Sequence, residues 1–231
     1  MNTTAKIPQT SKTAKIGLLG GTFDPIHNGH IDPAKQASKQ FMLDKVLVIP
    51  AHKPPHKNTT TASTLHRVKM AELASDNEAL FELDAREIQR STLSYTIDTL
   101  KEIKEEHPNS ELFFIMGMDS LLSFTRWHLW QDILLQCHLI VNTRPGYDLA
   151  TMNSATQALL TQHQIHIEDY QIKSQNHEAN KSGYIFLHST EAINVSSTEI
   201  RTNLGKGIDC SKWLTKNVRQ YITTHQLYKN T

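Results

Sequence analysis

The residues best suited to chemistry are two histidines, His27 and His30, that closely follow a glycine pair, Gly20 and Gly21. The histidines are three residues apart at the expected start of a helix, so both imidazole rings can lie on one face. Beside a bound phosphate, imidazole N–H groups can donate hydrogen bonds and stabilise the charge of a transition state. Solvated or capping histidines are the ordinary alternative, and a zinc site is a poor one without a third ligand nearby. The glycine pair before them favours phosphate chemistry.

The glycine pair ends a short apolar run, residues 15–19, which predicts a strand. Without a Cβ atom, Gly20 and Gly21 allow the backbone to turn tightly and to approach a ligand closely. Thr22 adds a hydroxyl donor, and the amides that lead into the next helix favour an anion. A glycine pair alone is usually only a tight turn, so this interpretation depends on the histidines that follow.

A second polar group opens an expected helix near the end of the chain, in residues 195–201. Here Ser196, Ser197 and Thr198 combine capping hydroxyl groups with free backbone amides. One turn later, Arg201 would present a planar guanidinium group that suits phosphate oxygens. Taken alone, this stretch is more simply an ordinary capped helix. Its presence in the same chain as the histidine pair favours a phosphate contact.

The elements that must position these residues alternate along the chain. Strands are expected at residues 15–19, 45–49, 80–84, 112–116, 138–142 and 184–187, and helices at residues 31–41, 64–75, 94–106, 148–164, 197–204 and 212–228. Several of the strands are apolar throughout, as in a parallel sheet that helices cover on both faces. The first strand, helix and strand form a right-handed βαβ unit. We therefore predict an α/β fold with a doubly wound, Rossmann-like parallel sheet.

One domain is expected to span residues 15–231, behind a disordered N-terminal tail at residues 1–14. The tail is polar and lacks the apolar core of a signal peptide. The domain is expected to end in a helical C-terminal part, from about residue 196 to residue 231. Pro33 is tolerable in the first turn of the first helix, and residues 174–182 are expected to form a polar loop.

Composition argues against several classes of protein. The 231 residues are 38% hydrophobic and 20% charged, as in an ordinary globular protein, and the formal net charge is +1. This charge gives no reason to expect nucleic acid or an anionic membrane as a partner. No apolar run approaches the roughly 20 residues that span a bilayer. Cys137 and Cys210 are far apart, which favours reduced thiols and a cytoplasmic location over a disulfide framework.

The segment with the glycines and histidines reads Gly-Gly-Thr-Phe-Asp-Pro-Ile-His-Asn-Gly-His over residues 20–30. It resembles the signature of the nucleotidyltransferase superfamily with the H-x-G-H motif, whose fold is similar to that of class I aminoacyl-tRNA synthetases. Residues 195–201 are similar to a second signature of that superfamily, I-S-S-T-x-I-R. The resemblance implies a set of residues that bind ATP: Gly20, Gly21, Thr22, Phe23, His27, His30, Gly117, Asp119, Ser196, Ser197, Thr198 and Arg201.

Further segments resemble the bacterial nicotinate-nucleotide adenylyltransferase family: residues 49–57, 67–74, 94–100, 116–120 with 127–128, and 142–147. In this resemblance Trp127 could stack on the nicotinate ring, and nearby amides could hold its carboxylate. The residues implied for nicotinate mononucleotide are Lys57, Tyr95, Thr96, Trp127, His128 and Arg144. Residues 49–57 could instead be a solvated basic loop, and Trp127 could be a core aromatic, as we expect for Trp130.

One departure from the family pattern follows the histidines. The family usually continues with a leucine, whereas Ile31, Asp32 and Pro33 stand here, somewhat closer to the phosphopantetheine branch. A phosphopantetheine adenylyltransferase-like enzyme is therefore the second candidate, although that branch lacks the elements at residues 94–100 and 127. A catalytically silent nucleotide-binding sensor is a third candidate, but the intact histidines give no sign of a lost site.

The resemblance implies a reaction that joins nicotinate mononucleotide to the AMP part of ATP. The products are nicotinate adenine dinucleotide (deamido-NAD+) and pyrophosphate, as in NAD biosynthesis. The acceptor phosphate has a second pKa of about 6, so it is largely dianionic and needs no general base. His27, His30, Lys57 and Arg201 would line the phosphates as catalytic groups, with Mg²⁺ bound to ATP. No residue is assigned as a metal ligand, and a homo-oligomer is compatible with this interpretation.

Overall fold

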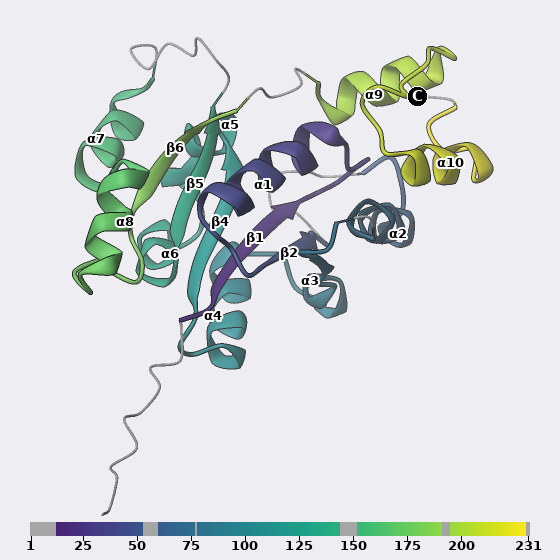
Figure 1. The fold of residues 1–231 in the computed structure, drawn as a ribbon. Coiled ribbons are helices and arrows are strands. Elements are labelled where there is room, and N and C mark those ends of the chain that lie inside the picture. Colours follow the sequence, from purple (N-terminus) through teal and green to yellow (C-terminus); the bar gives the residue numbers. More distant parts are fainter. Residues whose placement is uncertain (1–12, 53–59, 77, 144–151, 191–194, 230–231) are drawn as a thin grey trace, which may run out of the picture.

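A parallel sheet forms the centre of the computed structural model, which describes residues 13–52, 60–76, 78–143, 152–190 and 195–229. Within these residues six strands pair in the order β3-β2-β1-β4-β5-β6, all parallel (Figure 1). The strands are β1 (Lys15–Gly21), β2 (Lys45–Pro50), β3 (Phe81–Leu83), β4 (Glu111–Gly117), β5 (His138–Thr143) and β6 (Ile185–Ser189). The predicted doubly wound α/β fold is confirmed.

The direction of the strand order reverses at β1. The chain runs from β1 through β2 to β3 on one side, and then returns to place β4 on the other side of β1. Such a reversal leaves a crevice at the carboxyl ends of the two strands between which it occurs. Gly20 and Gly21 end β1, and Gly117 ends β4. The predicted glycine loop therefore stands at this crevice.

Strands β1, β2, β4, β5 and β6 send side chains to two apolar cores, one on each face of the sheet, whereas the edge strand β3 contributes to one of them. In β4, for example, Phe113 and Ile115 belong to one core, while Phe114 and Met116 belong to the other. The first core includes side chains of α1 (Asn28–Gln40), α2 (Thr64–Ser75) and α8 (Ile167–Gln175), and the second those of α4 (Thr96–Glu106), α6 (Trp130–Gln136) and α7 (Ser154–His163). Figure 1 shows α1 and α4 on opposite sides of β1.

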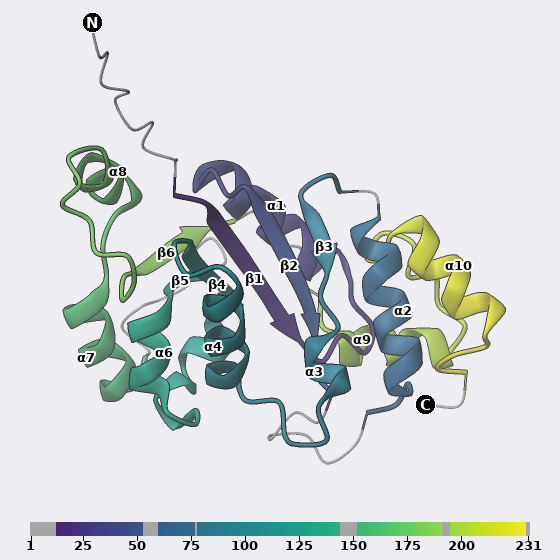
Figure 2. The same ribbon diagram turned by 90° about the horizontal axis from the view of Figure 1, so that it is seen from below.

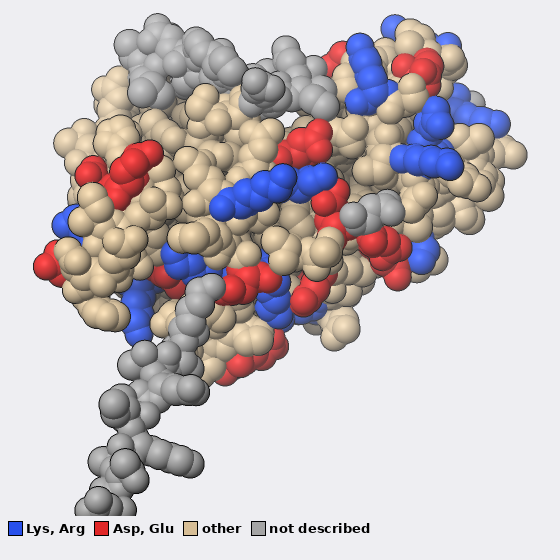
Figure 3. All heavy atoms as spheres, in the orientation of Figure 1, with Lys and Arg blue, Asp and Glu red and all other residues tan. Residues whose placement is uncertain are grey.

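The C-terminal part of the chain is helical, as predicted, with α9 (Ser197–Gly205) and α10 (Lys216–Thr224). Figures 1 and 2 both show α10 beside α2. Val218 and Ile222 are buried in the same core as Met70 of α2, which explains this arrangement. Figure 3 shows Lys and Arg side chains gathered over the α9–α10 end of one face, with mixed charges elsewhere on it.

Several local expectations were wrong. Helix α1 begins at Asn28, so the two histidines stand at its start as expected, but Pro33 lies inside the helix rather than in its first turn. Helix α10 begins at Lys216 because the Thr215 hydroxyl accepts a hydrogen bond from a first-turn amide. Short elements were not predicted, because tertiary contacts rather than their own periodicity stabilise such short helices. They are α3 (Arg86–Gln89), α5 (Met118–Leu121) and the 3₁₀ helix η1 (Phe124–Arg126).

Candidate active site

A pocket of about 560 Å³ lies at the crevice between the ends of β1 and β4. Its volume is within the range of sites for small molecules. Many of the predicted site residues line it: Gly20, Gly21, Thr22, His30, Tyr95, Thr96, Gly117, Asp119, Trp127 and His128. Other described candidates are not among the lining residues: Phe23, His27, Ser196, Ser197, Thr198 and Arg201. Lys57 and Arg144 lie outside the described residues.

The loop after β1 depends on a glycine at position 21. A Cβ atom there would come within 2.6 Å of the Phe23 ring. Phe23 itself has a φ of 52°, in the left-handed region, and its side chain is buried. Its ring meets the His30 ring edge to face at a centroid distance of 5.3 Å. Phe23 therefore supports both the loop and His30 from inside the fold.

The two histidine rings share one face of the start of α1, as predicted. Their centroids are 3.8 Å apart, and the small Gly29 permits this packing, because a Cβ atom there would approach His27 Nδ1 to 3.0 Å. The His27 amide donates a hydrogen bond to His30 Nδ1 at 3.3 Å. A neutral His30 ring therefore carries its proton on Nε2, the nitrogen that can donate to a phosphate oxygen.

Burial keeps His27 uncharged. Its side chain is 5% exposed, and burial, followed by the neighbouring His30, lowers its pKa to about 2. His27 can therefore act near neutral pH only as a neutral ring. Of the two histidines, His30 is the one that lines the pocket.

Aromatic side chains line the other end of the pocket. Tyr95 stands at the N-terminus of α4, and its ring lies 4.5 Å from that of His128. Trp127 lines the pocket and also packs edge to face on Phe114, at 6.0 Å between centroids. Trp127 therefore contacts the core and also borders the pocket, and its stacking on a nicotinate ring stays a prediction. Trp130 packs against the same core, as expected.

Residues 195–201, which carry the second signature, hold the loop after β1 in place. Ser196 caps α9. The Ser197 hydroxyl donates to the Pro25 carbonyl at 3.0 Å, and Arg201 Nη1 donates to the Asp24 carbonyl at 2.7 Å. These contacts join the start of α9 to the loop after β1. A direct contact of these side chains with ATP stays a prediction.

Arg67 is a site residue to which the sequence assigned no role. Its side chain is completely buried, and Nη1 donates to the carbonyls of Thr22 and Ala51 at 2.6 and 2.7 Å. These bonds join the loop after β1 to the loop after β2. Arg67 stands one turn before Met70 and Ala71 on the buried face of α2. The sequence signal that could have identified Arg67 is a charged residue on an otherwise apolar helix face. A buried charge must be hydrogen-bonded, so such a residue is expected to have partners elsewhere in the fold.

Asp24 is the second site residue to which the sequence assigned no role. Its buried carboxylate accepts hydrogen bonds from the amides of Thr61 and Ala62, at 2.7 and 3.1 Å. It also accepts a hydrogen bond from the Tyr228 hydroxyl at 2.8 Å. Burial and the Asp24 carboxylate raise the pKa of Tyr228 above its ordinary value. The end of the chain thus supports the loop that precedes the histidines.

Comparison with known proteins adds the family. The model of the cytidylyltransferase-like family matches residues 18–203. A probable nicotinate-nucleotide adenylyltransferase of Shewanella frigidimarina is 42% identical over 215 residues, which cover 93% of this chain and 100% of that protein. A probable nicotinate-nucleotide adenylyltransferase of Salmonella gallinarum is 43% identical over 215 residues, which cover 92% of this chain and 97% of that protein. The chain belongs to the nicotinate-nucleotide adenylyltransferase family.

Solved structures agree with this family on the fold. The nicotinic acid mononucleotide adenylyltransferase of Plasmodium falciparum, complexed with NaAD, is 20% identical with a TM-score of 0.69, over 94% of this chain and 98% of that one. A putative nicotinate-nucleotide adenylyltransferase of Vibrio parahaemolyticus is 17% identical, with a TM-score of 0.61. The match covers 95% of this chain and 98% of that one. Despite the departure at Ile31–Pro33, the 42% and 43% identical relatives place the chain in the nicotinate-nucleotide adenylyltransferase family.

Because His27 is buried, we predict that the folded chain loses stability in acid. In the unfolded chain a histidine has a pKa of about 6.5, whereas the pKa of His27 in the fold is about 2. Below pH 6.5 the unfolded state therefore binds a proton that the folded state excludes, so the free energy of unfolding falls with pH. We expect a slope of about 1.4 kcal/mol per pH unit from this group.

Urea unfolding of the chain and of its His27→Gln variant at pH 7, 6 and 5 measures this slope. The variant lacks the titrating group and should lose less stability between pH 6 and 5. Equal slopes for the two proteins would contradict the prediction.

Proposed function

We propose that this chain transfers the adenylyl group of ATP to nicotinate mononucleotide. The products would be nicotinate adenine dinucleotide and pyrophosphate, the dinucleotide serving NAD biosynthesis. The observation that carries the proposal is one pocket with two different ends. The glycine loop and His30 line it from β1 and from the face of the sheet that α1 covers. Tyr95 and Trp127 line it from the face that α4 covers, with His128 beside Tyr95. The family of the chain supports the same reaction.

In the proposed reaction an oxygen of the acceptor phosphate attacks the α-phosphorus of ATP. The bond from that phosphorus to the bridging oxygen of pyrophosphate breaks, and pyrophosphate leaves with the electron pair. A phosphate monoester is already largely dianionic at neutral pH, so no side chain needs to remove a proton. The chain then acts by positioning and by stabilising charge. His30 Nε2 would donate to the reacting phosphate, and the amides after β1 would hold the neighbouring phosphate oxygens.

Other groups complete this proposal. His27 would support His30 as a neutral ring, and Arg201 would hold the loop and contact ATP phosphate. Lys57, outside the described residues, would add positive charge near the phosphates. We propose that the pyridine ring of the acceptor binds at Tyr95, Thr96, Trp127 and His128. Arg144, outside the described residues, would also bind the acceptor.

Magnesium is proposed to arrive with ATP. Mg²⁺ prefers oxygen ligands and is usually bound through substrate phosphates and one or two carboxylates. Among the described residues no group of three or more His, Cys, Asp or Glu side chains could hold a metal ion. Asp119 is an exposed carboxylate that borders the pocket, so it fits an ion carried by the nucleotide. The ion would neutralise charge on the phosphates.

Location and assembly are further proposals. In the part of the chain that the structure describes, no helix is long and apolar enough to cross a membrane. Cys137 and Cys210 are both buried, free thiols, which supports a reducing, cytoplasmic environment. A homo-oligomer and the absence of a nucleic-acid partner remain expectations from the sequence.

A substrate panel tests the proposed function. Pyrophosphate release is measured from ATP with nicotinate mononucleotide, with nicotinamide mononucleotide and with phosphopantetheine. We expect turnover with nicotinate mononucleotide, and a lower kcat/KM with each of the other acceptors. A higher kcat/KM with phosphopantetheine would favour the second candidate. ATP binding without turnover on any acceptor would favour a silent nucleotide sensor.

A further inference from the structure

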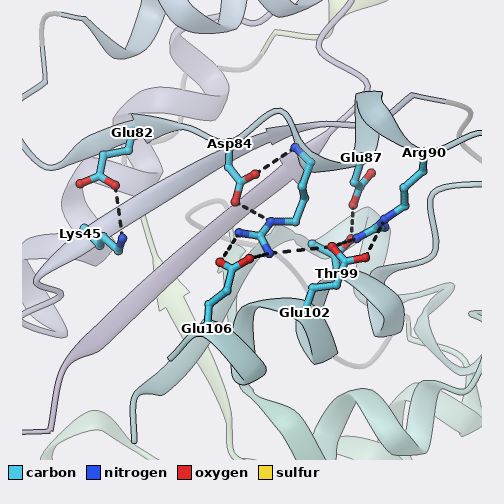
Figure 4. Close-up of polar contacts among 9 residues, drawn as sticks. Lys45, Glu82, Asp84, Glu87, Arg90, Thr99, Glu102 and Glu106 are labelled. Carbon is cyan, nitrogen blue, oxygen red and sulfur yellow. Dashed lines mark hydrogen bonds and ion pairs between the residues drawn. The ribbon is translucent and has the colours of Figure 1, made fainter. Parts of the chain in front are cut away.

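A buried polar network anchors α4, the helix whose start borders the acceptor end of the pocket. Figure 4 shows Glu87 and Arg90 directed toward α4, and Thr99 and Glu102 directed back from that helix. Glu87 belongs to α3, and Arg90 follows its last residue. The network therefore joins α4 to the segment that leads from β3. None of its members has a role in the proposed phosphate chemistry.

The Thr99 hydroxyl is the centre of this network. It donates to Glu87 Oε1 at 2.6 Å and accepts from Arg90 Nη1 at 2.9 Å. Arg90 also donates through Nε and Nη2 to the two carboxylate oxygens of Glu102, at 3.0 and 2.5 Å. Thr99 and Glu87 are both buried.

The network reaches the pocket. Glu87, Ser94 and Thr99 all line it, beside Tyr95 and Thr96. The Ser94 hydroxyl oxygen accepts a hydrogen bond from the His52 amide at 3.0 Å, and Ser94 also helps to lower the pKa of the Glu87 carboxyl group. Ser94 stands directly before Tyr95 in the chain. The same contacts that satisfy Glu87 thus determine where the first turn of α4 lies.

Glu87 makes this arrangement sensitive to the loss of one bond. Burial raises the pKa of its carboxyl group, while hydrogen bonds from Thr99 and Ser94 and the charge of Arg90 oppose that rise. Removing one partner of a buried, hydrogen-bonded ionisable group costs more than removing an exposed contact. The first turn of α4 should therefore shift when the Thr99 hydroxyl is lost.

We propose that Thr99 is a positioning residue for the acceptor nucleotide. Through Glu87 and Arg90 it holds the first turn of α4, and with it Tyr95 and Thr96, in the position that binds the pyridine nucleotide. This inference rests on the proposed function, because it assigns that end of the pocket to the acceptor. It predicts an effect on acceptor binding that is separate from ATP binding.

A neighbouring ion pair on α4, between Arg86 and Glu106, provides a matched control. Arg86 Nη1 also lies 3.8 Å from Glu102, so the control changes Glu106 and leaves Arg86 in place. Arg86 donates through Nη1 and Nη2 to Glu106 at 3.1 and 2.8 Å, and through Nε to Asp84 at 2.7 Å. Glu106 is the last residue of α4, and its side chain is 55% exposed. Neither Arg86 nor Glu106 is among the residues that line the pocket. Figure 4 shows this ion pair on the same helix as Thr99.

The experiment compares Thr99→Val, Thr99→Ser and Glu106→Gln in the full chain. Valine keeps the shape of threonine but removes both hydrogen bonds, whereas serine keeps the hydroxyl. We expect Thr99→Val to raise KM for nicotinate mononucleotide by about tenfold, the effect of losing a hydrogen bond to a charged group. Its KM for ATP should stay within about twofold, as should both KM values of Thr99→Ser and Glu106→Gln. Calorimetric titration with nicotinate mononucleotide alone should show the same loss of affinity.

Several outcomes would overturn the inference. They are equal rises in both KM values for Thr99→Val, an unchanged KM for the acceptor, or a serine variant as impaired as the valine variant. Should Thr99→Val fail to fold, Arg90→Lys provides the same test, because lysine cannot contact Thr99 and both Glu102 oxygens together. An unmodified chain that neither binds nor converts nicotinate mononucleotide would overturn the proposed function as well. A fully active unmodified chain with an unaffected Thr99→Val variant would overturn only this inference.

Discussion

Replacement of His30 by alanine is expected to lower kcat for dinucleotide formation by about 100- to 1,000-fold, the usual cost of removing one donor to a developing charge. His30 is the histidine of the pair that borders the pocket, and the His27 amide holds its Nδ1 so that Nε2 carries the proton. The lost hydrogen bond would act mainly on the transition state, so KM for ATP should change far less than kcat. Steady-state pyrophosphate release with saturating acceptor measures both constants.

An exposed histidine provides the control for this variant. His166 precedes α8, is not among the residues that line the pocket, and has an exposed side chain. His166→Ala should therefore keep the kcat of the unmodified chain. Near-normal turnover of His30→Ala would remove His30 from the catalytic role, and a similar loss in both variants would point to general damage instead.

Replacement of Arg67 by leucine is expected to lower the free energy of unfolding by about 3–5 kcal/mol, as for the loss of one partner from a buried charged group. Arg67 is completely buried and donates to backbone carbonyls of Thr22, Ala51 and His52. Leucine would leave these carbonyls without the guanidinium donor that now occupies a completely buried position. The loops after β1 and β2 would also lose the group that joins them. Urea unfolding, followed by circular dichroism, measures the effect.

Two further variants make the stability result specific. Arg219 lies on α10, the helix that packs beside α2, and its side chain is exposed, so Arg219→Ala should change stability by about 0.5 kcal/mol or less. Arg67→Lys keeps the charge but lacks the planar group that reaches several carbonyls, so it should fall between the unmodified chain and the leucine variant. A leucine variant as stable as Arg219→Ala would show that the Arg67 contacts contribute little.

Much of the fold could be predicted because its information is local. A strand such as β4 is buried on both faces, and its continuous apolar run, residues 112–116, records that burial directly. The alternation of such runs with amphipathic helices leaves a parallel, doubly wound sheet as the natural topology. The elements that were missed are short or polar. Helix α8 buries only Tyr170 among its residues, so its periodicity is too weak to read.

The candidate site could be predicted wherever one segment carries the whole signal. The histidine pair and the glycine loop are eleven consecutive residues, and the local chain brings the two rings together, because His27 is the N-cap of α1 and His30 lies in its first turn. The same holds for Tyr95 and Thr96 at the start of α4. The ligand contacts of Lys57 and Arg144 stay predictions.

The sequence by itself determined the type of sheet, the place of the glycine loop and the family of the chain. Only the tertiary structure decided what supports that loop. Asp24 is joined to Tyr228, 204 residues away, and Arg201 holds the Asp24 carbonyl across 177 residues. Periodicity reports which face of an element is buried, but not which distant donor satisfies a buried acceptor. That pairing exists only when the fold brings the two groups together, because every buried polar group must find its partner in three dimensions.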